Sequence, residues 1–213
     1  METERAEGIV VRLQPVTETS LLVTWFTREH GKLKTLAKGA RRPKSPLRGR
    51  IDLFYEDEII FLRSRRSDLH LLHDCFLENS HRRLRESLAG LMAASYVCEL
   101  VDVLTEVEDR HAAIYIALTQ VLGMLEKSAG VVPLLWFELQ VLAAAGWRPE
   151  FTDETGTGKV LRSLAAASAT GVQRVKLTVA QARAAQVKLG RFREEQVGRG
   201  LRSEKMCFEK INR

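Results

Sequence analysis

The sequence predicts an α+β protein in which a small all-β barrel precedes an α-helical domain. In roughly the first eighty residues, short apolar runs recur at intervals of about eight to twelve residues, a spacing typical of small barrels. After Asn79 the apolar residues follow a helical period instead. The chain has 213 residues, of which 45% are hydrophobic. This is enough to fill the core of one or two domains.

The strand-like runs fill the first part of the chain, and Gly31 supplies a turn between two of them. Because neighbouring residues of a strand point to opposite faces, one of Trp25 and Phe26 should face outward, as should one of Phe54 and Tyr55. An outward ring could stack on a nucleic-acid base, although burial in the barrel core is the commoner role for aromatic residues. The predicted strands are residues 7–12, 20–26, 32–37, 51–54, 58–62 and 69–77.

The second part begins with three predicted helices. Asn79 and Ser80 are good N-cap residues for the first of them. Pro133 suits the first position of the third helix, and Gly146 suits its end. The three helices are predicted over residues 82–104, from about residue 109 to residue 129, and over residues 133–146.

The last part of the chain is less regular. Residues 151–173 lose the helical period and predict a small, weakly structured insertion. Thr178 opens a capping-box pattern and with it a further helix, which Gly190 and later glycines are expected to break before a final helical segment. The predicted domains are a barrel domain at residues 1–80 and an α-helical domain at residues 81–213.

A cationic segment gives the strongest functional signal. Residues 38–46 read Lys-Gly-Ala-Arg-Arg-Pro-Lys-Ser-Pro, which places four cations in a loop punctuated by glycine and proline. Between Arg28 and Arg50, Glu29 is the only acidic residue. A solvated face, the alternative to a surface that meets phosphates, usually mixes both signs of charge. The candidate DNA-binding residues are Lys34, Lys38, Arg41, Arg42, Lys44, Arg48 and Arg50.

The overall charge favours a polyanionic partner. The formal net charge is +6 and the isoelectric point is about 9.4. Membranes, RNA and DNA all qualify as partners on charge alone. The longest stretch without a charged residue, 112–125, is too short to span a bilayer, and no signal-peptide pattern opens the chain. We therefore expect a cytoplasmic protein.

No residue pattern nominates a catalytic or metal centre. Cys75, Cys98 and Cys207 lack the paired spacing of metal ligands, so we interpret them as reduced and mostly buried thiols. His70 and His73 would lie on opposite faces of a strand. We expect no catalytic residues, no metal and no cofactor.

Residues 155–159, Thr-Gly-Thr-Gly-Lys, are superficially similar to a phosphate-binding loop. The P-loop pattern requires a glycine where Asp153 stands and a serine or threonine where Val160 stands. A hairpin or loose turn is therefore the better interpretation. A nucleotide-dependent enzyme that uses Gly156 to Lys159 is kept as a rival hypothesis.

Several motifs carry a family resemblance. The specific ones are Glu-Gly-Ile-Val-Val at residues 7–11, Glu-Thr-Ser-Leu-Leu at 18–22, Phe-Thr-Arg-Glu-His-Gly at 26–31 and Ala-Lys-Gly-Ala-Arg-Arg-Pro-Lys-Ser at 37–45. Less specific motifs lie at residues 137–149, 189–190 and 201–203. Together they resemble the RecO family of bacterial recombination mediators, over the whole chain except residues 151–173.

The resemblance implies an OB-fold barrel, an α-helical domain and a non-enzymatic protein. Such a protein would bind single- and double-stranded DNA, anneal complementary strands, and work with RecR to load RecA onto strands coated by single-stranded DNA-binding protein. The acidic C-terminal tail of that protein would meet Arg191, Arg199 and Arg202. Many family members carry a four-cysteine zinc module where residues 151–173 lie, but this stretch has no cysteine, so the insertion is degenerate here. The rival from another class is a protein-interaction scaffold with a basic face.

Overall fold

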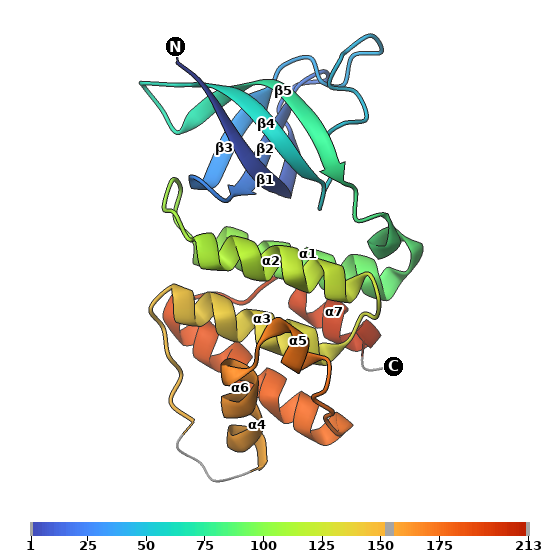
Figure 1. Cartoon of the computed structure of the whole chain (residues 1–213), viewed down its shortest axis with the longest axis vertical. Helices are drawn as coiled ribbons and strands as arrows, with labels where there is room; N and C mark the ends of the chain where they lie inside the picture. Colours follow the sequence, from blue (N-terminus) through green and yellow to red (C-terminus); the bar gives the residue numbers. More distant parts are fainter. Residues whose placement is uncertain (1, 152–155, 212–213) are drawn as a thin grey trace. The chain divides into compact units, whose positions relative to one another are not determined.

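The computed structural model describes residues 2–151 and 156–211 (Figure 1). The chain divides into two compact units. The first contains the residues up to His81 together with Thr105–Tyr115, and the second contains Arg82–Leu104 and the residues from Ile116 onward. The mixed α+β architecture agrees with the predicted fold class.

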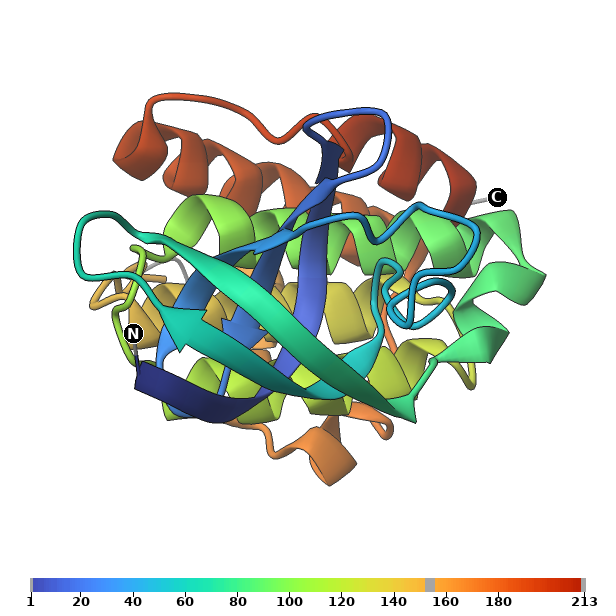
Figure 2. The same ribbon diagram turned by 90° about the horizontal axis from the view of Figure 1, so that it is seen from above.

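The first unit is a closed five-stranded barrel with the neighbour order β1-β2-β3-β5-β4 (Figure 2). β3 and β5 pair in parallel, while the other neighbouring strands pair antiparallel. Closure gives every one of these five strands a neighbour on both sides. The strands are β1 Glu2–Pro15, β2 Leu21–Thr27, β3 Gly31–Ala37, β4 Glu56–Arg63 and β5 Leu69–Asn79.

The barrel interior is filled by alternate residues of the strands, among them Trp25, Ile59 and Phe61. The indole Nε1 of Trp25 donates a hydrogen bond to Thr35 Oγ1 at 2.8 Å, so its polar atom is satisfied inside the core. Phe26 is also fully buried. Alternation places Phe26 on the outer side of β2, but that side is covered at this position, so the expectation that an outward ring of this pair is open to a partner is wrong.

Residues 51–54 do not form the predicted strand. They end the long connection between β3 and β4, where Ile51 packs into the barrel core. Phe54 is buried and has a φ of 69°, a left-handed conformation that no strand contains. Its amide donates to the carbonyl of Val10, and the amide of Val10 donates to the carbonyl of Tyr55, both at 2.9 Å. The apolar run thus supplies core contacts from a loop.

The connection after the first long helix packs on the barrel, which the sequence did not indicate. Lys32 Nζ donates to the carbonyl of Thr105 at 2.6 Å, and Glu108 accepts from Arg63 and pairs with His70. A Cβ atom at Gly31 would lie 1.8 Å from a carbonyl oxygen of this connection, so only glycine fits there.

The barrel interior also holds an unpaired carboxyl group. Asp57 shares the inner face of β4 with Ile59 and Phe61 and is fully buried. Neither of its carboxylate oxygens has a hydrogen-bond partner among the described residues. Burial raises the pKa of Asp57, and together with the nearby charges of Glu78 and Glu56 it brings this pKa to about 7.

Replacing this carboxyl by an amide, Asp57→Asn, is expected to stabilise the protein, and to do so more strongly at pH 8 than at pH 5. The folded state keeps the Asp57 proton up to a pH of about 7, whereas the unfolded chain releases it near the ordinary pKa of 3.8. The folded state binds more protons between these values, so stability falls by about 1.4 kcal/mol per pH unit as the pH rises through that window.

Urea unfolding of the wild type and the variant at pH 5 and pH 8 measures this effect. The exposed Asp68→Asn is the matched control, because it removes the same charge from the surface. Identical pH dependence in both variants would show that the Asp57 carboxyl does not titrate in this window.

The second unit consists of helices. α1 begins at Leu88, later than predicted, because Asn79 ends β5 and its Oδ1 accepts from the amide of His81. Ser87 Oγ instead accepts from the amide of Gly90 at the start of α1. The helices are η1 Arg82–Glu86, α1 Leu88–Leu104, α2 Ala112–Leu125, α3 Val131–Ala144, α4 Gly156–Ala166, α5 Ala169–Val172, α6 Val179–Val197 and α7 Glu204–Ile211; α2 begins in the first unit.

The predicted weak insertion is wrong for most of its length, because it forms α4 and α5. Gly158, Leu161 and Leu164 are spaced by three residues and are buried on one helix face. Small and hydroxyl-bearing residues around them hide this period in the sequence. Residues 152–155, which complete the predicted insertion, lie outside the described residues.

The capping box at Thr178 is confirmed, and α6 runs on through Gly190 to Val197. The prediction that Gly190 breaks this helix is wrong. A Cβ atom there would lie 2.9 Å from Glu204 Oε1, so the glycine allows close approach of the α7 side chain. The helix ends at Gly198, whose φ is 73°.

A buried polar network links four helices of the second unit. Arg193 on α6 is fully buried and forms ion pairs with Glu138 on α3 and Glu204 on α7. Tyr96 on α1 donates its hydroxyl proton to Glu138 Oε2 at 2.7 Å and accepts from Arg193 Nη1 at 3.1 Å. Burial raises the pKa of Glu138, and the Arg193 guanidinium offsets part of that rise.

Two further expectations concern thiols and membranes. Cys75, Cys98 and Cys207 are free and buried, as predicted. Among the described helices, none has the length and apolar character needed to cross a bilayer.

Candidate nucleic-acid interface

The loop after β3 holds its cations on an anchored backbone. The amide of Gly39 donates to Ser20 Oγ at 3.2 Å, and the amide of Arg41 donates to the carbonyl of Thr19 at 2.9 Å. Ala40 and Leu47 are buried in the barrel core. The backbone of the loop is therefore held in place before any ligand binds. This reduces the conformational entropy that the loop would lose on binding a phosphate.

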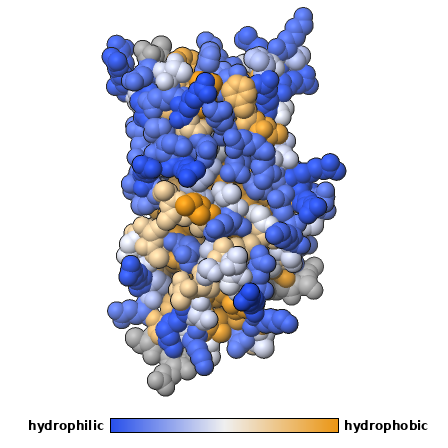
Figure 3. Space-filling view, viewed as in Figure 1, coloured by the Kyte–Doolittle hydropathy of each residue, from blue (hydrophilic) through white to orange (hydrophobic). Residues whose placement is uncertain are grey.

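Most of the predicted DNA-binding residues lie together on this loop. The side chains of Lys38, Arg41, Arg42 and Lys44 are exposed, and none forms an ion pair with a described residue. Arg48 is exposed as well and donates to the carbonyl of Pro43 at 3.3 Å. In the view of Figure 3 the barrel unit presents a mainly hydrophilic face. We call Lys38, Arg41, Arg42, Lys44 and Arg48 the cationic loop.

Two of the predicted residues have other positions. Arg50 Nη1 donates to Asp74 Oδ1 at 3.1 Å and to the carbonyl of Cys75 at 3.4 Å, so it ties the loop to β5 and part of its charge is neutralised. Lys34 lies within β3, four residues before Lys38, which corresponds to about 13 Å along a strand. It is partly exposed and opposite Leu69 of β5.

The connection between β4 and β5 adds two cations that the sequence prediction did not include. Arg65 and Arg66 are exposed and line a hollow of about 490 Å³ on the outer side of the barrel. The signal in the sequence is the run Arg-Ser-Arg-Arg-Ser-Asp at residues 63–68, but such a run is equally typical of a solvated strand connection. The other lining residues are Leu36, Leu62, Ser64, Leu69, His70 and Leu71.

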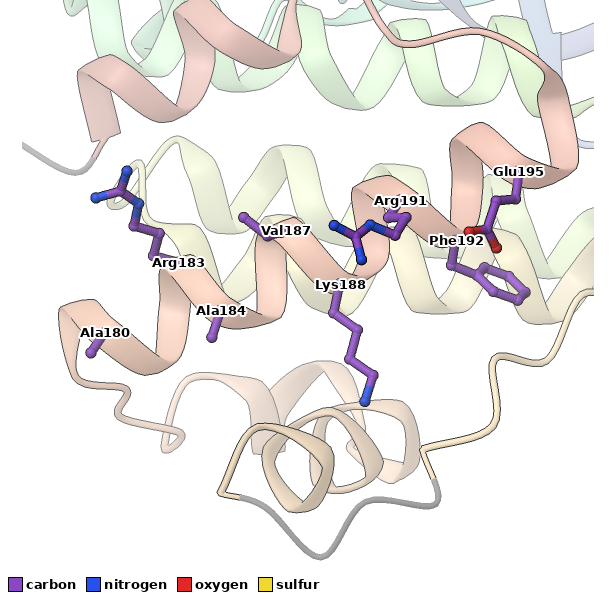
Figure 4. Close-up of a pocket in the computed structure, with 8 residues that line it drawn as sticks. All are labelled: Ala180, Arg183, Ala184, Val187, Lys188, Arg191, Phe192 and Glu195. Carbon is purple, nitrogen blue, oxygen red and sulfur yellow. The ribbon is translucent and has the colours of Figure 1, made fainter.

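A second hollow, of about 780 Å³, follows the exposed side of α6 (Figure 4). All its lining residues belong to that helix, and its apolar part is formed by Ala180, Ala184, Val187 and Phe192. Arg191 lies in it, together with Arg183 and Lys188, which the sequence prediction missed. The other candidates for partner binding, Arg199 and Arg202, are exposed but do not line the hollow.

The structure offers little support for a metal or nucleotide site. No group of three or more histidine, cysteine, aspartate and glutamate side chains in residues 2–151 and 156–211 could hold a metal ion. Gly156 to Lys159 lie in the first turn of α4 and Gly158 is buried, so these residues form neither the predicted turn nor a glycine-rich loop.

The five-stranded closed barrel and the helices together define an α+β protein of the OB-fold class. Residues 1–81 match the family model Recombination protein O N terminal, and residues 85–171 match Recombination protein O C terminal. The chain belongs to the RecO family of DNA repair proteins.

Curated relatives agree with this assignment. The chain is 34% identical over 160 residues to the DNA repair protein RecO of Symbiobacterium thermophilum, which covers 74% of this chain and 62% of the relative. It is 32% identical to that of Pelotomaculum thermopropionicum, covering 70% of this chain and 57% of the relative. It is 34% identical to the DNA repair protein RecO of Rhodopirellula baltica, which covers 67% of this chain and 53% of the relative. The matched part thus spans less than two thirds of each relative.

Proposed function

We propose that this chain is a non-enzymatic DNA-binding mediator that anneals complementary strands. With RecR, it would help to load RecA onto single-stranded DNA coated by single-stranded DNA-binding protein. It would act in the cytoplasm, at the nucleoid. The observation that carries the proposal is the cationic loop, whose exposed side chains have one sign of charge on an anchored backbone. Membership of a DNA repair family supports the same conclusion.

Annealing requires no covalent chemistry. Two DNA strands repel each other through their phosphates, and bound cations reduce that repulsion while the bases stay free to pair. Lys38, Arg41 and Arg42 are exposed and can contact the phosphates of either single or double strands, because phosphate contacts carry no sequence information. Binding should therefore tolerate any base sequence.

An annealing assay tests the proposal. Two complementary oligonucleotides, one labelled, are mixed with the full chain, first bare and then coated with single-stranded DNA-binding protein. We expect duplex formation to accelerate in both cases. A protein that accelerates neither reaction would be a basic interaction scaffold instead, the second hypothesis, provided that it still binds an acidic protein tail.

We further propose that the α6 hollow binds the acidic, apolar C-terminal tail of single-stranded DNA-binding protein. Such a tail needs an apolar surface for its end and cations for its carboxylates. Val187 is 55% exposed and supplies apolar surface, while Arg183 and Arg191 lie on the same side of the helix. Arg199 and Arg202 would contact acidic residues further along the tail.

The double variant Arg183→Ala/Arg191→Ala is expected to weaken binding of a labelled tail peptide to the full chain by roughly tenfold, because it removes charged hydrogen bonds. Fluorescence anisotropy at low salt measures the affinity. Arg82→Ala/Arg83→Ala in η1 is the matched control, since it removes the same charge from other exposed positions. An equal loss of affinity in both double variants would reduce the effect to net charge and remove α6 from the site.

A further inference from the structure

The outer face of the barrel formed by β1, β4 and β5 carries acidic residues beside an exposed aromatic ring. Glu7 of β1 is opposite Glu58 of β4, which in turn is opposite Phe76 of β5. Phe76 is 45% exposed. Like charges directly opposite each other on neighbouring strands destabilise a sheet, and an exposed ring contributes little to the hydrophobic core. The stability of the barrel therefore does not explain this row of residues.

Glu78, near the end of β5, adds a third carboxylate to this face. Partial burial raises its pKa, and the carboxylates of Glu7 and Glu58 are among the nearby charges that raise it further. Arg5 pairs with Glu58 at 3.1 Å and Arg28 with Glu7 at 3.2 Å, whereas Glu78 is exposed and forms no ion pair with a described residue. The negative charge is thus only partly neutralised. We call Glu7, Glu58, Phe76 and Glu78 the acidic face.

The acidic face and the start of the cationic loop lie at opposite ends of the barrel. Gly31 at the start of β3 pairs with the end of β2, and Ala37 at the end of β3 pairs with the beginning of β2. The carbonyl of Glu7 accepts from the amide of Arg28, next to the first of these ends, while the amide of Arg41 is bonded near the other. The steps from Gly31 to Ala37 correspond to about 20 Å along a strand, more than an arginine side chain spans. Within one molecule, Arg41 therefore cannot contact the acidic face.

We infer that the cationic loop of one molecule docks on the acidic face of a second copy of this chain. The two surfaces are complementary in charge, because the loop presents exposed cations and the acidic face an excess of carboxylates. Pro43 and Pro46 of the loop are exposed and supply apolar surface for the ring of Phe76. Since two different surfaces meet, the contact is head-to-tail and does not have to close into a dimer.

This docking would regulate DNA binding, an aspect of the inference that rests on the proposed function. The contact covers the loop to which the proposed function assigns the phosphates, so DNA and a second copy compete for the same cations. A small contact that depends on exposed charges is weak and sensitive to salt. Free protein at high concentration would therefore keep its loop covered until DNA displaces the neighbouring copy.

Sedimentation of the full chain without DNA tests the docking. At low salt the average mass should rise with protein concentration beyond that of a dimer, and at about 1 M salt, where charges are screened beyond about 3 Å, the chain should be monomeric. Glu58→Gln/Glu78→Gln is expected to weaken self-association roughly tenfold or more, because it removes two carboxylates that accept from the loop. Glu18→Gln/Glu209→Gln is the matched control, since it removes the same charge from exposed positions outside the acidic face. Unchanged association in the first variant, or an equal loss in both, would overturn the inference.

A mixture of two variants tests which surfaces meet. Arg41→Ala/Arg42→Ala/Lys44→Ala keeps the acidic face, and Glu58→Gln/Glu78→Gln keeps the cationic loop. Each variant alone should be largely monomeric. An equal mixture should form a complex of one copy of each and nothing larger, because only one intact loop and one intact face can meet. A mixture that stays monomeric contradicts the docking.

A single-stranded oligonucleotide separates this inference from the proposed function. Its addition should dissociate the self-associated wild type, because both ligands occupy the cationic loop. If the wild type self-associates in this way but binds no DNA, the proposed function fails and the docking stands. If the wild type binds DNA and stays monomeric at low salt, or binds DNA without dissociating, the docking fails and the proposed function stands.

Discussion

Replacing Arg193 by methionine should destabilise the protein by about 3–5 kcal/mol, the cost of removing one partner from a buried ion pair. Glu138 is buried beside it and would keep only the Tyr96 hydroxyl as a partner in this network. Glu204 is partly exposed, so water can solvate its carboxylate after Arg193 is removed. The helices α1, α3, α6 and α7 would no longer share these polar interactions, so we expect the helical unit to unfold first.

Urea unfolding followed by circular dichroism measures this destabilisation. Arg191→Met is the matched control on the same helix, because Arg191 is exposed, and it should change stability by no more than about 0.5 kcal/mol. The double variant Arg193→Met/Glu138→Leu should recover much of the stability, since it removes both charges from the core. If Arg193→Met unfolds within about 1 kcal/mol of the wild type, the network does not hold these helices together.

The second large effect concerns the cationic loop. Arg41→Ala/Arg42→Ala/Lys44→Ala should weaken binding of both single- and double-stranded DNA roughly tenfold or more, whatever the base sequence. The three side chains are exposed and the backbone is held by Gly39, Ala40 and Leu47, so the fold should tolerate the change. The slope of log affinity against log salt on single strands should fall by up to about 0.7 for each phosphate that the variant no longer neutralises.

A control must separate direct binding from net charge. Arg82→Ala/Arg83→Ala/Arg85→Ala removes the same number of cations from the exposed side of η1. This variant should shift affinity only slightly and leave the slope unchanged. Equal changes in the two triple variants would mean that DNA responds to the overall charge of the protein and does not contact the cationic loop.

The strands and the exposure of the loop could be predicted from the sequence because the signals are local. Alternation marks β4, and glycine and proline mark the turn after β3. The burial of Phe26 could not be predicted, because alternation places it on the outer side of β2, and only the folded chain shows that this side is covered. The prediction of a strand at residues 51–54 was wrong for a similar reason, since an apolar run can also reach the core from a loop.

The missed residues are those whose role depends on distant partners. Arg193 occupies the position of an apolar residue on the buried side of α6, and its partners Tyr96 and Glu138 lie far away in sequence. Arg65 and Arg66 line a hollow together with leucines that the closure of the barrel brings beside them. The domain bounds, the DNA contacts and the partner sites stay predictions.

The most direct test of the central claim is the affinity of the wild-type chain for a single-stranded oligonucleotide as a function of salt. If the five exposed cations of the cationic loop contact phosphates, log affinity should fall linearly with log salt, with a slope of up to about −3.5 from this loop alone. Absence of binding at low salt, or binding whose affinity does not depend on salt, would contradict the assignment of this loop as a DNA-binding surface.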